Sequence, residues 1–247
     1  MAQIELRHCT VKVKDGLAGT AVGPTTPPVA TDTTIAMLTS VALNTKVATL
    51  IPIGARFTIA GETTSTVHVV TGRTPTTMGP TTDITFSPAL GAGTYAANAV
   101  LTFQSQEISV KIGNGNLTYS ETKNYDYVLD RGDLDTVREL DEAPMALTID
   151  AVYEFITTGT SEDVTFVDAI KGIGGAAEWV SSSSDPCEPY AVDIEILDVP
   201  PCGVTETENT LFPDFRRDSL DMDLSKATIS LKGKCNASEP VVTRVAA

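Results

Sequence analysis

Residues 147–155 read LTIDAVYEF, and this stretch indicates the fold class. Apolar side chains stand at every second position from Leu147 to Phe155, with mostly polar ones between them. Successive side chains of a β-strand point to opposite faces, so a period of two predicts a strand with one buried face. The other face would carry Asp150 and Glu154.

The same period recurs along the chain, whereas helical periodicity is almost absent. The sequence GNG at 113–115 lies between two alternating runs and tolerates the positive φ angles of a tight turn, which predicts a β-hairpin. Further strands are expected at residues 4–14, 56–60, 66–70, 84–86, 100–103, 191–199 and 228–234.

One helix is expected near residues 160–172. Thr160 or Ser161 could cap its first turn, and Gly172 could end it. We therefore predict a mainly β chain, an antiparallel β-sandwich or partly open barrel with one flanking α-helix.

The composition divides the chain into two parts. Residues 1–104 hold 6 basic and 5 acidic side chains, whereas residues 105–247 hold 11 basic and 27 acidic ones. Residues 24–104 contain 21 threonines, and the proline-rich stretch 23–28 leads into them. We expect a β-sandwich domain made of residues 1–20 and 105–247, with residues 21–104 inserted as a small all-β module.

The overall balance limits the function classes. A net charge of −15 and a pI near 4.4 argue against a protein that binds nucleic acid by neutralising phosphates. No apolar run approaches the roughly 18 residues of a membrane span. The first residues lack the basic-then-apolar layout of a signal peptide, so we expect a soluble chain made in the cytoplasm.

Catalytic and metal-binding signatures are weak. The four cysteines form no CxxC pair. Cys187 and Cys235 would lie at the same end of two antiparallel strands, so a disulfide or a shared metal remains open, although a cytosolic origin favours free thiols. His68 is expected to be an ordinary half-exposed strand residue. We predict no catalytic residue, no metal site and no cofactor.

The charged segment 130–142, DRGDLDTVRELDE, is expected to be a long loop between two strands. Its apolar residues make it unlike a disordered linker, and its two arginines suit salt bridges with a neighbouring molecule. The alternative is a solvated charged loop. We favour a subunit-interface loop, with the candidate contact residues Asp130, Arg131, Asp133, Leu134, Asp135, Val137, Arg138, Glu139 and Leu140.

Several motifs, in order and spacing, resemble the major tail tube protein of long, non-contractile (siphovirus-type) bacteriophage tails. The resemblance covers residues 1–20 and 105–240. Its motifs are VKIG at 110–113, NLTYSE at 116–121, LDRG at 129–132, VRE at 137–139, YAVDIE at 190–195, FPDFR at 212–216 and ISLKGKCN at 229–236. Residues 21–104 depart from the minimal pattern of the family.

The resemblance implies a structural virion protein without enzymatic activity. Such subunits form hexameric rings that stack into a tube, bind other tail proteins at the tube ends and are assembled in the host cytoplasm. In that family a long loop between two strands reaches the neighbouring ring, and segment 130–142 is the matching position here. The genomic DNA passes through the lumen without specific binding, and no membrane is involved.

An acidic lumen wall would repel DNA and keep it sliding. Because strand alternation cannot distinguish the lumen from the outside, the lumen-facing candidates remain Asp150, Glu154, Asp193 and Glu195. The inserted module is expected on the outside of the tube. The alternatives are a head–tail connector or surface adhesive β protein and, third, a glycosidase that uses paired carboxylates.

Overall fold

The structure is a computed structural model of the whole chain. Its contacts divide the chain into two compact units, residues 1–13, 109–155 and 191–247 in the first and residues 14–108 and 156–190 in the second. The residues described are 9–17, 19–22, 27–36, 51–74, 83–113, 116–131, 133–152, 164–183, 185, 187–198 and 206–246.

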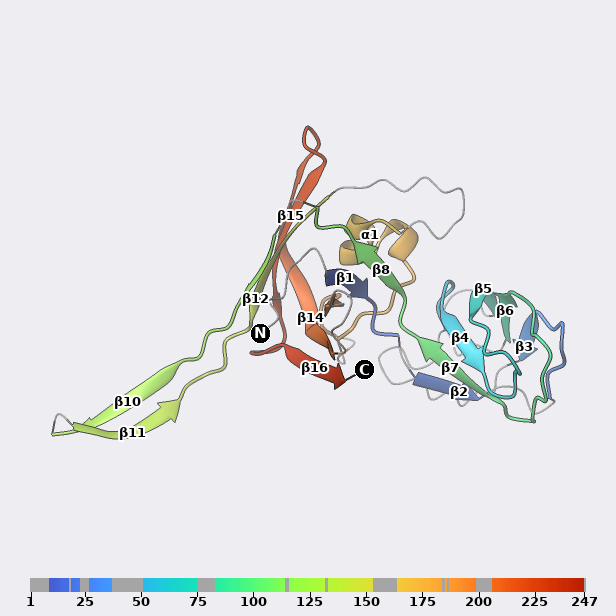
Figure 1. The fold of residues 1–247 in the computed structure, drawn as a ribbon, viewed down its shortest axis with the longest axis horizontal. Helices are drawn as coiled ribbons and strands as arrows, with labels where there is room; N and C mark the ends of the chain where they lie inside the picture. Colours follow the sequence, from blue (N-terminus) through green and yellow to red (C-terminus); the bar gives the residue numbers. More distant parts are fainter. Residues whose placement is uncertain are drawn as a thin grey trace. The chain divides into compact units, whose positions relative to one another are not determined.

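The first unit is built on an eight-stranded sheet. Seven strands follow the order β8-β1-β13-β14-β15-β12-β9, and the eighth, β16, pairs with β14. The strands are β1 (Cys9–Lys14), β8 (Glu107–Val110), β9 (Leu117–Ser120), β12 (Ala146–Val152), β13 (Val192–Asp198), β14 (Glu206–Asp223), β15 (Thr228–Cys235) and β16 (Val241–Ala246). Strands β12, β14 and β15 lie side by side in Figure 1.

Strand β14 gives this sheet its curvature. Its first half pairs with β13 and its second half pairs with β15, so one long strand serves both parts of the sheet. The ring of Tyr119 on β9 lies 5.3 Å from the ring of Phe212 on β14, although two strands, β15 and β12, lie between β14 and β9 in the sheet order. The sheet therefore folds over its own core, as a β-sandwich does.

The alternation at 147–155 is confirmed for the residues that the structure describes. Leu147, Ile149 and Ala151 are at most 1% exposed, and their partners on β15 include the buried Leu231. The predicted strands at 191–199 and 228–234 are present as β13 and β15. Burial of one face of each strand supplies the hydrophobic free energy that fixes the register.

The hairpin predicted around residues 113–115 is wrong. Strand β8 pairs with β1, and β9 pairs with β12, so the two runs lie at opposite edges of the sheet. Gly113 has the expected positive φ of 60°, and the backbone N–H of Val152 donates to the carbonyl of Lys111. A local turn signal was overridden by pairing with strands that are distant in sequence.

The second unit contains a six-stranded sheet with the order β2-β7-β4-β5-β6-β3. Its strands are β2 (Gly19–Val22), β3 (Thr34–Ala36), β4 (Arg56–Ile59), β5 (His68–Thr74), β6 (Asp83–Ser87) and β7 (Val100–Gln104). Phe57, Phe86 and Leu101 are among the most buried residues of its core, at 0–2% exposure. The threonine-rich segment is therefore a β-structure with its own core, and four of its strands match the predicted positions.

The helical segment of the second unit is shorter than expected. Helix α1 (Phe166–Lys171) begins after Thr165, whose hydroxyl accepts from the N–H of Asp168 while the Asp168 carboxylate accepts from the N–H of Thr165. The predicted caps Thr160 and Ser161 lie outside the described residues. Gly172 ends the helix in the left-handed region, as predicted, and the turn η2 (Gly174–Ala176) follows.

A buried carboxylate joins three segments of this unit. Asp15 is 1% exposed and accepts from the backbone N–H groups of Leu17, Gln106 and Val180, at 3.2, 2.8 and 3.4 Å. Burial raises the pKa of Asp15 to about 7, against the opposing effect of these hydrogen bonds. Residues 15–17, 106 and 180 are thereby tied together within the unit.

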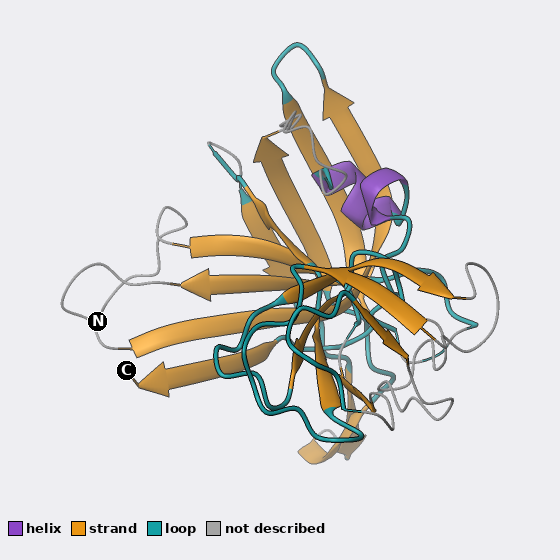
Figure 2. Ribbon diagram, turned by 90° about the vertical axis from the view of Figure 1, so that its right-hand side faces the viewer, coloured by secondary structure: helices purple, strands orange, loops and turns teal. Residues whose placement is uncertain are grey.

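The described chain is mainly β, with antiparallel sheets and one short α-helix, as the sequence predicted. In Figure 2, strands make up most of the regular secondary structure, and helical segments are few. The expected inserted segment, 21–104, supplies strands β3 to β7 of the six-stranded sheet and the last two residues of β2. Segment 156–190, which the sequence assigned to the larger domain, groups with residues 14–108 by contacts.

Candidate functional site

The first unit carries a β-hairpin that pairs with none of the other described strands. Strands β10 (Tyr125–Asp130) and β11 (Asp133–Glu139) are antiparallel and form a two-stranded sheet of their own. Arg131 at the turn has a φ of 51°, and the backbone N–H of Leu140 donates to the carbonyl of Asn124 at the base. The register, with one irregularity between Val128 and Leu129, fixes which residues share a face.

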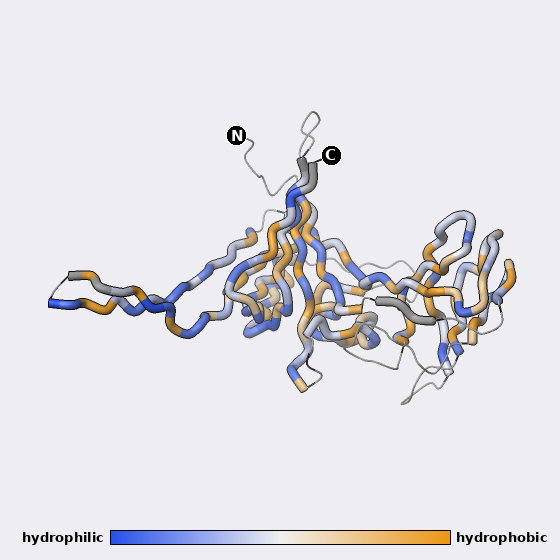
Figure 3. Tube along the Cα trace, turned by 90° about the horizontal axis from the view of Figure 1, so that it is seen from below, coloured by the Kyte–Doolittle hydropathy of each residue, from blue (hydrophilic) through white to orange (hydrophobic). Residues whose placement is uncertain are grey.

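The two faces of the hairpin differ in polarity. Residues that stand opposite each other in an antiparallel pair project to the same face. One face therefore carries five apolar side chains. Figure 3 shows hydrophobic and hydrophilic stretches interspersed along the hairpin. These five, called the apolar hairpin face below, are Tyr125, Tyr127, Leu129, Leu134 and Val137.

All five are exposed in the single chain, from 45% for Tyr125 to 69% for Leu134. The opposite face carries Asp126 beside Arg138 and Val128 beside Thr136. A two-stranded ribbon without a covering layer is marginally stable in water, and contiguous exposed apolar surface marks an interaction site. The apolar hairpin face is therefore the strongest candidate functional surface of the first unit.

The expected loop at 130–142 is wrong in its secondary structure. Asp130 ends β10, residues 133–139 form β11, and only Leu140 and the residues after it leave the ladder. The segment remains a connection between β9 and β12, but an ordered hairpin occupies it. Of the candidate contact residues, Leu134 and Val137 belong to the apolar face, whereas Arg138 belongs to the polar one.

The two arginines were expected to form salt bridges with a neighbour. Both are exposed, and within the described residues neither guanidinium has an ion pair. Arg138 stands opposite Asp126 in the register without a salt bridge between them among the described contacts. Both charges remain accessible to a second molecule.

The lumen candidates separate into three cases. Asp150 is half-buried on the polar side of β12, opposite Ser230, and Asp193 is half-buried and accepts from the N–H of Asp214 at 2.9 Å. Glu195 is only 9% exposed and accepts from Nδ2 of Asn209, so its side chain does not line a surface. Glu154 lies outside the described residues.

The polar face around Asp150 has mixed charge. In the rows that cross β12, β15 and β14, Lys232 and Lys234 lie on the same face as Asp150, and so do Arg216 and Asp221. The lysines are exposed. A strongly acidic sheet face is therefore absent from this part of the described structure.

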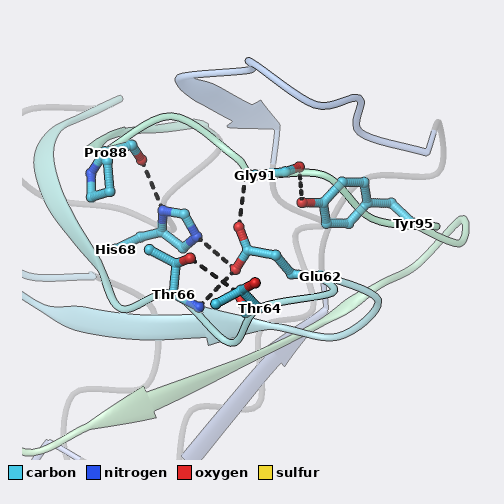
Figure 4. Close-up of polar contacts among 7 residues, drawn as sticks. All are labelled: Glu62, Thr64, Thr66, His68, Pro88, Gly91 and Tyr95. Atoms are coloured by element: carbon cyan, nitrogen blue, oxygen red, sulfur yellow. Dashed lines mark hydrogen bonds and ion pairs between the residues drawn. The ribbon is translucent and has the colours of Figure 1, made fainter.

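His68 is buried, which corrects the expectation of a half-exposed residue. Its Nδ1 lies 2.8 Å from the carbonyl of Pro88, and its Nε2 lies 3.3 Å from the carboxylate of Glu62 (Figure 4). Glu62 also accepts from the N–H groups of Thr66 and Gly91. Burial acts to raise the pKa of Glu62, but these hydrogen bonds outweigh it and lower that pKa below its ordinary value.

This pair belongs to a core. Phe57 and Phe86 pack against the His68 ring with centroid distances of 5.4 and 5.3 Å. Both the imidazole and the carboxylate side chain are at most 1% exposed, so no substrate could reach them without opening the sheet. The arrangement stabilises the β4–β5 connection and the 88–91 turn.

None of the described cysteines forms a disulfide bond. Cys187 is exposed and Cys235 is buried, and Cys202 lies outside the described residues. Burial and the charges of Asp193 and Asp214 raise the pKa of Cys235 to about 12. Within the described residues, no group of three His, Cys, Asp or Glu side chains could hold a metal ion.

The apolar hairpin face was not identified from the sequence. Two alternating runs flank Arg131 and Gly132, and a two-residue gap of this kind is typical of a β-hairpin. The high density of charged residues favoured a loop instead. The buried Asp15 and Glu62 had no local signal, because their donors lie up to 165 residues away in the sequence.

Within the described part of the chain, no helix is long and apolar enough to cross a membrane. No protein-family model, no curated protein and no solved structure matches this chain.

Proposed function

We propose that this chain is a structural subunit of the tail tube of a long, non-contractile bacteriophage tail, and that hairpin β10–β11 joins one subunit to another. The observation that carries the proposal is the apolar hairpin face, five exposed apolar side chains on a ribbon that pairs with none of the other described strands. The motif resemblance around residues 110–145 and 190–236 supports the same reading.

Burial of the apolar hairpin face by a partner would be energetically favourable. Fully burying one large apolar side chain contributes about 1.5–3 kcal/mol. Tyr127, Leu129 and Leu134 are each more than half exposed in the single chain, so a partner that covers them gains most of this contribution. The hairpin carries more acidic than basic side chains, which favours a receiving surface that is not itself acidic.

Symmetry links this contact to a tube. If the hairpin of one subunit docks on a different surface of the next, the interface is heterologous and repeats from subunit to subunit. Such contacts close into rings or extend into filaments. Several parts of the proposal rest on the resemblance alone. They are the hexameric rings and their stacking, the other tail proteins at the tube ends, the location in the virion, the assembly in the host cytoplasm and the absence of enzymatic activity.

The charges beside the lumen candidates bear on how DNA would pass. Asp150 and Asp193 remain candidates for a wall along which genomic DNA passes, and Asp150 shares a polar face of the sheet with Lys232 and Lys234. We infer a wall in which carboxylates and lysines are interspersed. Such a wall holds DNA less strongly than a basic one, because fewer phosphates are neutralised.

Negative-stain electron microscopy of the purified full chain tests the proposal. The wild-type chain is expected to form rings and tubes, and the double variant Tyr127→Ser/Leu134→Ser is expected to remain a folded monomer. The variant changes two side chains that are 57% and 69% exposed in the single chain, so its circular dichroism spectrum should match that of the wild type.

Val128→Ser is the matched control, because it removes an apolar side chain from the opposite face of the same hairpin. This variant should still form tubes. Normal tubes from the double variant would exclude the hairpin contact, and a wild-type chain that stays monomeric at every concentration would exclude a tube subunit and favour an adhesive β protein.

Amide hydrogen exchange gives a second readout. The amides of β10 and β11 should exchange quickly in the monomeric double variant and slowly in wild-type tubes, since the assembly covers the ribbon. Equal exchange in both would show that the hairpin stays uncovered in the assembly.

A further inference from the structure

A pocket of about 320 Å³ lies within the second unit. Its walls come from strands β4 and β5, from residues 106–108 and from the segment 174–179. Arg56 stands opposite Val69 in the ladder and lines the pocket with it, whereas Phe57 and His68, the next pair, face the core. The pocket therefore opens on the outer face of the six-stranded sheet.

The wall formed by residues 174–179 is anchored to the sheet. Nη1 of Arg73 donates to the Glu178 carboxylate at 2.7 Å and to the carbonyl of Ile51 at 3.0 Å. The Arg73 side chain is only 5% exposed. Because the Arg73 side chain is largely buried, its ion pair with Glu178 fixes segment 174–179 relative to strand β5. A binding pocket needs walls at such a fixed separation.

The charges at the pocket leave one cation in excess. Glu178 is paired with Arg73, and Glu107 lies 3.7 Å from Nζ of Lys14. Arg56 is exposed, and no hydrogen bond or ion pair of its guanidinium occurs among the residues described. Two of the three charged lining side chains are thus neutralised, which leaves the guanidinium of Arg56 to attract an anion.

The remaining lining has a polar and an apolar part. Trp179 is 7% exposed and forms part of the wall with Val164, whereas Thr71 and Gln106 offer hydrogen-bonding groups. An aromatic side chain beside a few polar groups is typical of pockets that bind small molecules. A planar guanidinium binds carboxylate or phosphate in a bidentate manner.

We propose that this pocket binds a small anionic ligand with a hydroxylated ring, of the acidic monosaccharide class. The carboxylate of the ligand pairs with Arg56, its hydroxyls reach Thr71, Gln106 and the carboxylates at the rim, and its apolar ring face lies toward Trp179 and Val164. This binding activity is separate from assembly through the hairpin, and it does not depend on the proposed tail-tube function.

The chain contains a single tryptophan, so its fluorescence reports on this pocket alone. The full chain is titrated with methyl β-D-glucuronide and with methyl β-D-glucoside, which share the ring but differ in the carboxylate. We expect a saturable fluorescence change with the glucuronide and binding at least about tenfold weaker for the glucoside, as the loss of one charge-assisted contact predicts. Sodium phosphate is the third probe, and it should bind more weakly than the glucuronide because it has no ring.

Arg56→Gln removes the charge from an exposed strand position, and Lys226→Gln makes the same charge change on an exposed turn outside this unit. The first variant should weaken glucuronide binding about tenfold or more, and the second should leave it unchanged. Thermal unfolding of both variants should match the wild type, which separates loss of binding from loss of structure.

Any one of the following results would overturn the proposal. They are the absence of any saturable change with the glucuronide, equal affinity for the glucuronide and the glucoside, and equal weakening by both variants. Phosphate that binds as tightly as the glucuronide would also overturn it, since the ring would then contribute nothing.

Discussion

The six-stranded sheet and the β10–β11 hairpin use the same alternation of apolar and polar residues with opposite outcomes. In the sheet, the alternating side chains Phe57 and Leu101 face a closed core and are fully buried. In the hairpin, which pairs with none of the other described strands, Tyr127 and Leu134 are 57% and 69% exposed. Alternation decides which side chains share a face, but a second layer is needed to cover that face.

Polar groups show the same contrast in burial between the second unit and the hairpin. Inside the second unit, Asp15 and Glu62 are buried and accept several hydrogen bonds each, so removing one leaves N–H groups without an acceptor. On the hairpin, Asp126 and Arg138 are exposed to solvent. Substitutions inside the second unit should therefore change folding, whereas substitutions on the hairpin should change association.

The largest effect is expected for Leu101→Ala in the core of the six-stranded sheet. Leu101 is 0% exposed, and truncating a buried leucine costs about 2.7–5 kcal/mol through lost burial and the cavity left behind. Denaturant unfolding followed by Trp179 fluorescence should show this loss in the second unit. A change below about 1 kcal/mol would mean that this core is loosely packed.

The next effect is the pH dependence due to Asp15. Its folded pKa of about 7 lies above the ordinary value of 3.8, so between these limits the folded state holds a proton that the unfolded state has released. Its contribution to stability is therefore fully present below about pH 4 and is lost as the pH rises toward 7, with a slope of at most about 1.4 kcal/mol per pH unit.

Asp15→Asn removes the titrating group and should flatten the stability of the second unit between pH 4 and 7 relative to the wild type. Unfolding at several pH values, again followed by Trp179, measures the difference. Parallel curves for both proteins across this range would contradict a raised pKa for Asp15.

A smaller loss is expected for Glu62→Gln. The substitution weakens the contacts with Thr66 and Gly91 and removes the charge that faces His68, at a cost of about 1–3 kcal/mol. Because the folded pKa of Glu62 is lowered, its contribution is present above the ordinary value of 4.5 and is lost as the pH falls below it. The difference between wild type and variant should therefore shrink in acid.

The smallest effect on folding is expected for Leu134→Ala, the counterpart of Leu101→Ala on the uncovered hairpin. At 69% exposure, this side chain should change the unfolding free energy of the single chain by less than about 0.5 kcal/mol. Denaturant unfolding of the monomer measures it. A loss comparable to that of Leu101→Ala would show that Leu134 is covered within the chain and would remove the contrast between the two regions.

Local signals predicted much of the secondary structure. The runs at 147–155 and 228–234 and the stop at Gly172 were predicted because alternation and a left-handed cap depend on near neighbours. Helix α1 begins at the capping box of Thr165 and Asp168, and the predicted caps Thr160 and Ser161 lie outside the described residues. Expectations failed where a distant partner decided the outcome.

The sequence by itself determined that this chain is mainly β, because side-chain alternation and turn residues are properties of neighbours in the chain. Only the tertiary structure decided that the run at 108–112 pairs with β1 instead of β9, that Asp15 is buried among three segments and that the hairpin's apolar face stays uncovered. These outcomes depend on which distant strands supply hydrogen-bond partners and a covering layer, and the burial of apolar area and backbone groups is a property of the whole fold.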